Sequence, residues 1–292
     1  MRIPAALGLA VAVLAVSWGA PLARLTHAAP LAVALWRMVL ASALIVPFAL
    51  LRGGPRLTRA QRRPVALSGL LLGLHFGLWI PSLWLTTVSA SVVLVTTMPL
   101  WVLLASPRFL GTQIRRRNLL SFLLAIAGVA VIAWGDVHIS PRALLGDAMA
   151  LGGAVAGAGY LVVGKRLRHE VPLVRYLAWV YGGAAVTLAA GVLALGAPVW
   201  PEDARSWWTL LALAVGPTLI GHSLLNWALA HVEAYRVNLT VLLEPVLASL
   251  WAWIFLVQAP PLHVVPGAVL VIAALVIELW PGGPAEVTAR PT

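Results

Sequence analysis

The sequence predicts an all-α membrane protein with ten transmembrane helices in two inverted five-helix repeats and with both termini in the cytoplasm. Three observations predict this fold class: an apolar composition, a regular succession of apolar runs, and a biased distribution of arginine. Of the 292 residues, 61% are hydrophobic and only 10% are charged, and the mean hydropathy is +0.96. A soluble domain of this composition would expose apolar surface that it could not cover, whereas in a bilayer the lipid is the solvent.

The apolar runs have the length that a membrane crossing requires, because a helix needs about 20 apolar residues to span the hydrocarbon core. Transmembrane helices are expected at residues 4–22, 30–51, 65–86, 90–109, 118–135, 145–164, 173–195, 207–229, 236–257 and 264–280. The first run resembles a signal peptide. Only Arg2 precedes it, however, and similar runs follow it, so we interpret it as an uncleaved first helix.

The basic residues alternate between the two sides of the expected bundle. With a cytoplasmic N-terminus, the inner segments hold sixteen of the 20 Lys and Arg residues, namely Arg2, Arg52, Arg56, Arg59, Arg62, Arg63, Arg108, Arg115, Arg116, Arg117, Lys165, Arg166, Arg168, Arg175, Arg236 and Arg290. The outer segments hold Arg24, Arg142 and Arg205, and Arg37 lies within the second expected helix. The positive-inside rule therefore predicts cytoplasmic termini. The net charge of +11 belongs to these loops, so no nucleic-acid partner is expected.

The two halves of the sequence resemble each other. The segment 84–91 runs on to Met98-Pro99, and the segment 227–234 runs on to Glu244-Pro245; each begins with the Trp that ends one helix and leads to a proline within the next. Because each half has an odd number of helices, the second copy is expected to be inverted. We assign residues 1–140 to the first repeat, 141–283 to the second and 284–292 to a short cytoplasmic tail. Inverted repeats are typical of secondary transporters, whose substrate site lies near the midplane; chance likeness of two Leu/Ala-rich stretches is the alternative.

Short segments along nearly the whole chain carry a family resemblance through their order and spacing. They are Trp18-Gly19-Ala20-Pro21, Leu35-Trp36-Arg37, Ser89-Ala90-Ser91, Met98-Pro99, Ala127-Gly128-Val129, Leu145-Gly146-Asp147, Leu243-Glu244-Pro245 and Pro266-Gly267-Ala268. In these segments the sequence resembles the drug/metabolite transporter (DMT) superfamily, in its ten-helix branch with paired EamA domains, which includes bacterial exporters of amino acids, aromatic ones among them. The resemblance implies export or exchange of small solutes by alternating access in the cell inner membrane. The family's frequent Gly-Glu pair after the fourth helix is replaced here by Leu110-Gly111-Thr112-Gln113, which weakens transfer of a coupling role to acids in the loops.

Polar and aromatic side chains share faces of several expected helices and predict a substrate pocket. His75, Trp79 and Ser82 follow an i, i+4, i+7 spacing on one helix face. The candidate substrate-binding residues are His75, Trp79, Ser82, Thr97, Trp101, Tyr160, His222, Asn226, Glu244 and Trp251. A pocket walled by tryptophan with a few polar donors suits an amphipathic solute with an apolar side chain. The alternative for each tryptophan is packing between helices.

Prolines and charges within the expected helices predict further roles. Pro99 and Pro245 interrupt their helices, and we expect them to be hinges. A charge at membrane depth costs several kcal/mol unless it is paired or hydrated. Glu244 could bind a substrate amino group or carry a proton, or it could form a buried pair. Arg37 is expected to be structural, anchored to a carbonyl or a carboxylate, and Asp147 to lie at the positive end of a helix dipole.

The sequence also bounds the class of function. The chain has no cysteine, which excludes disulfides, thiolate catalysis and cysteine-bound metals. It lacks the common hydrolase, metalloprotease and P-loop motifs, so no catalytic residue, metal or cofactor is expected. We expect a monomeric secondary transporter of small metabolites, amino acids first among them. The alternatives are a facilitator of other amphipathic metabolites or drugs, a membrane-embedded enzyme, or a scaffold without flux.

Overall fold

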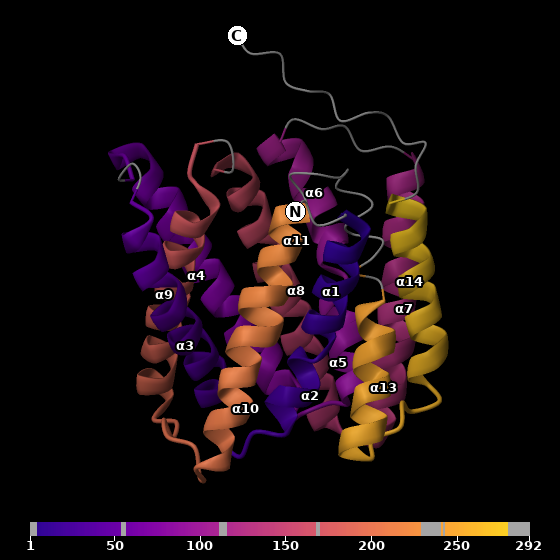
Figure 1. The fold of residues 1–292 in the computed structure, drawn as a ribbon. Helices are drawn as coiled ribbons and strands as arrows, with labels where there is room; N and C mark the ends of the chain where they lie inside the picture. Colours follow the sequence, from indigo (N-terminus) through magenta and orange to yellow (C-terminus); the bar gives the residue numbers. More distant parts are fainter. Residues whose placement is uncertain are drawn as a thin grey trace.

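The computed structural model describes residues 5–53, 57–110, 116–167, 170–228, 241 and 243–279. Within these residues every regular element is helical, and the helices run side by side along one common direction (Figure 1). The elements are α1 (Ala5–Ser17), α2 (Gly19–Arg24), α3 (Pro30–Leu51), α4 (Arg59–Ser82), α5 (Val88–Val95), α6 (Met98–Leu110), α7 (Arg116–Ile139), α8 (Pro141–Leu167), α9 (Leu173–Leu195), α10 (Arg205–Leu213), the π-helix η1 (Ala214–His222), α11 (Ser223–Ala228), α13 (Glu244–Leu256) and α14 (Val264–Leu279).

Seven helical stretches of the described chain are long and apolar enough to cross a membrane, and α13 and α14 contain shorter apolar helices. This agrees with the predicted all-α membrane class, while the number of crossings stays a prediction. α3 and α9 have the predicted bounds. α4 begins six residues before its predicted start because Thr58 and Gln61 form a capping box, in which each backbone N–H donates to the other's side chain. A hydropathy window does not detect such a cap.

α8 also begins earlier than predicted, at Pro141 instead of residue 145. Proline suits the first turn of a helix because its missing N–H would have no helical partner there. Asp147 consequently lies in the second turn of α8, where it is buried, and not at the helix start. The predicted interaction with the end of the helix dipole is weakened by this shift, since the dipole effect falls off within the first turn.

Two prolines inside membrane-length segments, Pro99 and Pro217, coincide with a break or a distortion of the helix. A proline ring clashes with the carbonyl four residues earlier, and the helix that contains Pro99 stops at Val95 and resumes at Met98. In the π-helix η1, Pro217 frees the carbonyl of Leu213, which accepts a hydrogen bond from Thr218 Oγ1 (3.1 Å). Pro245 is the second residue of α13. Residues 229–240, which include the start of the predicted ninth helix, lie outside the described residues.

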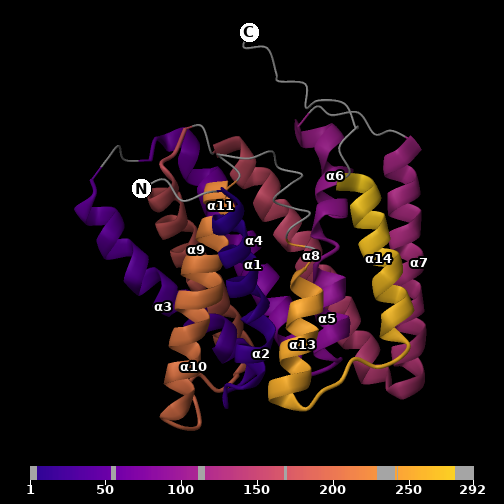
Figure 2. The same ribbon diagram turned by 45° about the vertical axis from the view of Figure 1, so that its right-hand side comes forward.

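The helices pair in a reciprocal pattern. α3 packs on α9, α5 on α13 and α7 on α14, and each pair joins helices that hold the same expected position in the two halves. α4 packs on α8, and its counterpart is the contact of α1 with η1 and α11. In both ribbon views α7 and α14 lie side by side at one edge of the bundle, with α3 at the opposite edge (Figure 2). This is the pattern that two halves related by a two-fold axis would produce.

The arginine-rich segments meet at one end of the bundle. Arg175 Nη2 donates to Gly53 O (3.1 Å), and Gln61 Nε2 donates to Glu170 Oε2 (3.2 Å). Arg166 donates to the carbonyl of Phe109. These bonds join the ends of α3, α6 and α8 and the starts of α4 and α9, so the described residues of the basic clusters share one side of the molecule.

Candidate functional site

A buried arginine lies where helices from both halves of the chain converge. Arg37 of α3 is only 1% exposed. Its Nε donates to Thr218 Oγ1 of η1 (2.7 Å), and its Cζ lies 4.1 Å from the centroid of the Phe76 ring of α4. Tyr181 of α9 and Glu244 at the start of α13 lie within electrostatic range of the guanidinium. Five helices thus bring side chains to one charged centre.

We call this group the central cluster: Arg37, His75, Phe76, Trp79, Tyr181, Thr218, His222 and Glu244. Four of its members were predicted as substrate-binding residues, namely His75, Trp79, His222 and Glu244. Their roles in binding stay predictions. Phe76, Tyr181 and Thr218 were not predicted from the sequence, although Thr218 follows a proline in an apolar helix and Tyr181 is a polar group in the middle of another. These two features of the sequence could have indicated that Thr218 and Tyr181 belong to the site.

α4 brings His75 and Trp79 into the central cluster against the backbone of α8. His75 Nδ1 lies 2.8 Å from Gly153 O, and its ring stacks on Trp79 at 5.9 Å between centroids. A carbonyl oxygen only accepts, so Nδ1 carries the hydrogen, and a neutral imidazole then keeps Nε2 as an acceptor. A Cβ atom at Gly153 would lie 3.1 Å from Trp79 Cβ. The glycine therefore permits the close approach on which this contact depends.

The π-helix η1 contributes two side chains from the other half. Thr218 and His222 are four residues apart in η1, and the His222 ring lies edge-on to Phe76 at 6.3 Å between centroids. π-Helical turns are frequent at functional sites. Here the π-helix contains Pro217, and the next residue, Thr218, carries the hydroxyl that accepts the hydrogen bond from Arg37.

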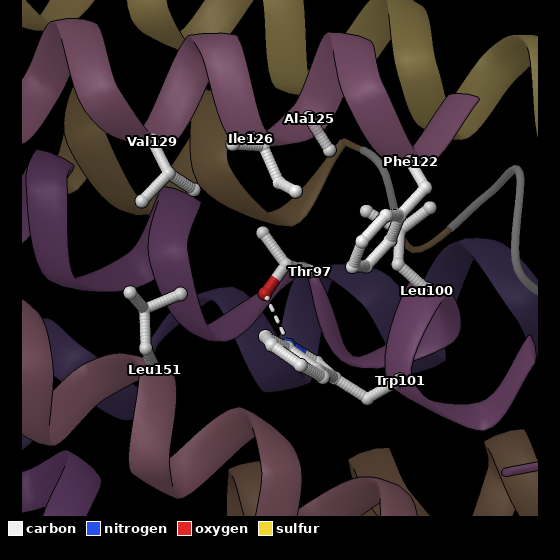
Figure 3. A pocket seen from close by; sticks show the side chains of 8 residues that line it. All are labelled: Thr97, Leu100, Trp101, Phe122, Ala125, Ile126, Val129 and Leu151. Atoms are coloured by element: carbon white, nitrogen blue, oxygen red, sulfur yellow. Dashed lines mark hydrogen bonds between the residues drawn. The ribbon is translucent and has the colours of Figure 1, made fainter. Parts of the chain in front are cut away.

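Thr97 and Trp101 lie at a different, apolar pocket. The pocket has a volume of about 130 Å³. Figure 3 shows its lining residues, Thr97, Leu100, Trp101, Phe122, Ala125, Ile126, Val129 and Leu151. Trp101 Nε1 donates to Thr97 Oγ1 (3.1 Å), so these two polar groups satisfy each other. No residue of the central cluster lines this pocket, so the structure separates two residues that the sequence grouped with His75.

The remaining predicted residues make contacts between helices. Ser82 Oγ donates to Trp79 O (2.6 Å) and shares a hydrogen bond with Ser91 Oγ (2.7 Å), which joins the end of α4 to α5. Tyr160 stacks on Tyr176 at 6.5 Å, between α8 and α9.

Trp251 joins α13 to the first half. Its Nε1 donates to Ser17 Oγ (3.0 Å), and its ring stacks on Trp18 at 5.0 Å. The side chain of Asn226 lies outside the described part of the chain. Pro99 and Pro245 each stand second in a helical segment, and their role as hinges stays a prediction.

At the end of the bundle opposite the basic clusters, a polar contact joins the two halves. His27 Nδ1 lies 2.9 Å from Asp203 Oδ2, Ser206 N donates to Asp203 Oδ1 (2.7 Å), and His27 N donates to Ser206 Oγ (3.0 Å). The hydrogen bonds from Ser206, and then the interaction with His27, hold the pKa of Asp203 below its usual value. Trp36 Nε1 donates to Val199 O (2.8 Å) beside them. We call His27, Asp203 and Ser206 the 27–203 latch.

Comparisons with known proteins agree with this architecture. The chain is 23% identical over 244 residues to the uncharacterized transporter YdfC of Bacillus subtilis (strain 168), which covers 83% of this chain and 79% of that protein. It is 22% identical over 190 residues to the uncharacterized transporter YoaV of the same organism, covering 64% of this chain and 65% of that protein. A crystal structure described only as that of a protein shares the fold, with a TM-score of 0.64, 21% identity and coverage of 94% of this chain and 96% of that chain.

A family model matches in two segments, residues 3–134 and residues 144–280, so that each half of the chain carries one match. Members of the matched family are multi-pass membrane proteins that transport small molecules, which agrees with the apolar helices described above. Since these segments include most of the sequence, the chain belongs to the EamA-like transporter family.

Proposed function

We propose that this protein is a secondary transporter that exports or exchanges amino acids, apolar and aromatic ones included, by alternating access. One observation carries the proposal: the central cluster combines residues of both halves around a buried charge. Arg37 and Phe76 come from the first half, and Thr218 and Glu244 from the second. A solute bound there would contact both halves, so its binding could bias their relative position.

Two findings support the proposed arrangement in the membrane. The reciprocal helix pairing and the two matches of the family model favour two inverted five-helix repeats, divided near residue 140, with ten crossings. The basic segments gathered at one end of the bundle favour cytoplasmic termini in the inner membrane. The 27–203 latch would then lie on the outer side, where it joins the two halves. The family and both relatives are named as transporters, which are not enzymes.

The chemistry of the central cluster supports an amphipathic substrate. Phe76, Trp79 and Tyr181 offer aromatic surface, and Arg37 and Glu244 offer one group of each charge sign. A zwitterion with an apolar side chain matches both features. Pro99 follows a break in its helix and Pro245 stands second in α13; prolines are positions at which a helix bends easily, which suits movement of one half against the other.

Counterflow into proteoliposomes tests this function. Liposomes that contain the purified protein and an unlabelled amino acid should accumulate the labelled form, whereas protein-free liposomes should not. His75→Ala and Trp79→Ala should reduce exchange without preventing insertion, because both side chains are buried in the central cluster. Trp134→Ala is the matched control, since Trp134 is 71% exposed on α7. Absence of exchange for every amino acid would contradict the proposal.

Trp101→Ala tests whether the apolar pocket also takes part in transport. Reduced exchange in this variant would make the pocket lined by Thr97 and Trp101 part of the solute path. Unchanged exchange in both Trp101→Ala and His75→Ala would refute the predicted substrate pocket.

A further inference from the structure

We infer that the Arg37 guanidinium is the binding site for the carboxylate of the transported solute. The substrate class is then amino acids with a free carboxyl group, as opposed to amines, amides or esters of the same shape. This deepens the proposed function and rests on it for the transport consequence. The binding consequence can be tested separately.

The first argument is that the charge of Arg37 lacks a counter-ion. In the part of the chain that the structure describes, no carboxylate forms an ion pair with Arg37 within 4.0 Å. Glu244 interacts with Arg37 electrostatically but forms no such pair. A buried charge without a close partner costs several kcal/mol. An anion that enters the central cluster would remove this cost.

The second argument is that free donors lie around the guanidinium. Among the described residues, Arg37 Nη1 and Trp79 Nε1 are buried and have no hydrogen-bond partner. The two side chains are neighbours, since Arg37 Cζ lies 6.0 Å from the centroid of the Trp79 ring. Both groups only donate. A carboxylate, which has two oxygens and only accepts, is the complementary group, and an amine is not.

The third argument is that the guanidinium is held in one orientation. Thr218 accepts the hydrogen bond from Nε, and the Phe76 ring covers the guanidinium at 4.1 Å. Contacts of this kind fix the plane of the guanidinium and leave Nη1 as a donor that a ligand can use. Arg37 therefore does more than the structural anchoring that its sequence position suggested.

The neighbourhood also selects among anions. Glu244 in its ionised form disfavours a dianion such as phosphate, because its charge acts on the same centre. The rings of Phe76 and Trp79 provide apolar surface for a side chain. A monocarboxylate that also bears an ammonium group balances Arg37 and Glu244 together. Free amino acids have this combination of groups.

Isothermal titration calorimetry on the detergent-purified full chain tests the assignment with matched pairs of an acid and its decarboxylated amine. The pairs are L-phenylalanine with phenethylamine, L-leucine with isoamylamine, and L-alanine with ethylamine. At least one acid should bind about tenfold or more tightly than its amine. Arg37→Gln should weaken binding of that acid about 10- to 100-fold, the range for hydrogen bonds to charged groups, and should leave amine binding within about twofold.

Arg24→Gln is the matched control. Arg24 also lies over an aromatic ring, with its Cζ 5.0 Å from the Trp84 centroid, but it stands at the end of α2 and outside the central cluster. This variant should bind like the wild type. Should Arg37→Gln fail to insert, Arg37→Lys and Thr218→Val provide the same test. Lysine keeps the positive charge but lacks the planar guanidinium that can bind a carboxylate with two hydrogen bonds. Valine at residue 218 removes the acceptor for Arg37 Nε. Each should weaken the acid more than the amine.

The outcomes separate the two proposals. If the wild type prefers no acid over its amine, or if Arg37→Gln weakens acid and amine equally, the carboxylate assignment is wrong. A preference for the acid in binding, without counterflow of any solute, would refute the transport function and leave the assignment intact. Counterflow of acids that persists undiminished in Arg37→Gln would refute the carboxylate assignment and leave the transport function intact.

Discussion

Replacing Gly69 with alanine tests the close contact between α4 and α9, on which the position of the central cluster depends. A Cβ atom at residue 69 would lie 2.9 Å from Gly183 Cα and 3.2 Å from Val180 O. These are backbone atoms, which cannot rotate away as a side chain can. Carbon–carbon contacts are optimal at about 3.5–4.0 Å, so the helices must separate by roughly 0.6 Å or more.

The expected cost follows from two opposing effects. Inserting a methyl group into a packed contact costs about 1–3 kcal/mol, while alanine is favoured over glycine in a helix by about 1 kcal/mol. The net effect of Gly69→Ala is therefore a destabilisation of up to about 2 kcal/mol, which corresponds to a fall in melting temperature of a few degrees. α4 carries His75 and Trp79, so the displacement should also weaken substrate binding.

The assay compares apparent melting temperatures in detergent at one scan rate, together with counterflow activity. Gly182→Ala is the matched control, because Gly182 lies on the partner helix α9 and a Cβ atom there has no neighbour within 4 Å. It should leave the melting temperature unchanged or raise it slightly. The reasoning about the contact is refuted if Gly69→Ala raises the melting temperature as much as Gly182→Ala does.

Three further predictions concern charges and a contact between the halves. If Glu244 carries the coupling proton, Glu244→Gln should abolish any dependence of uptake on a pH gradient; a wild type that is indifferent to the gradient would instead be a facilitator. Because the pKa of Asp203 is lowered, its contribution to stability is present above the usual pKa of a carboxyl group and is lost as the pH falls through the lowered value. The difference in melting temperature between wild type and Asp203→Asn should therefore shrink in that acid range, and a constant difference would contradict the latch. Trp251→Phe should lower the free energy of unfolding by about 1 kcal/mol, because the hydrogen bond to Ser17 Oγ is lost while the aromatic contact remains. The double variant Trp251→Phe with Ser17→Ala tests this pairing. A larger loss of stability in the double variant than in either single variant would refute it.

Much of the architecture was predictable because it depends on local properties of the chain. The bounds of α3 and α9 follow from the length of their apolar runs. The break before Pro99 follows from the clash of its ring with the carbonyl four residues earlier, which ends the helix at Val95. The segments rich in arginine lie at one end because helices of membrane length alternate in direction. Each of these features depends on neighbouring residues or on the succession of apolar runs along the chain, and not on which helices pack together.

The site depended on contacts that no local pattern specifies. A helical spacing tells which side chains share a face, but not which helix that face meets. The partner of Arg37 is Thr218, 181 residues away, and its hydroxyl is presented by a π-helix. Thr97 and Trp101 shared a helix face as predicted, yet that face lines an apolar pocket and not the central cluster. The sequence by itself determined that the chain is helical and where most of its apolar helices lie, while the orientation of these helices in the membrane stays a prediction. Only the tertiary structure decided which buried groups meet, because that depends on how distant helices pack.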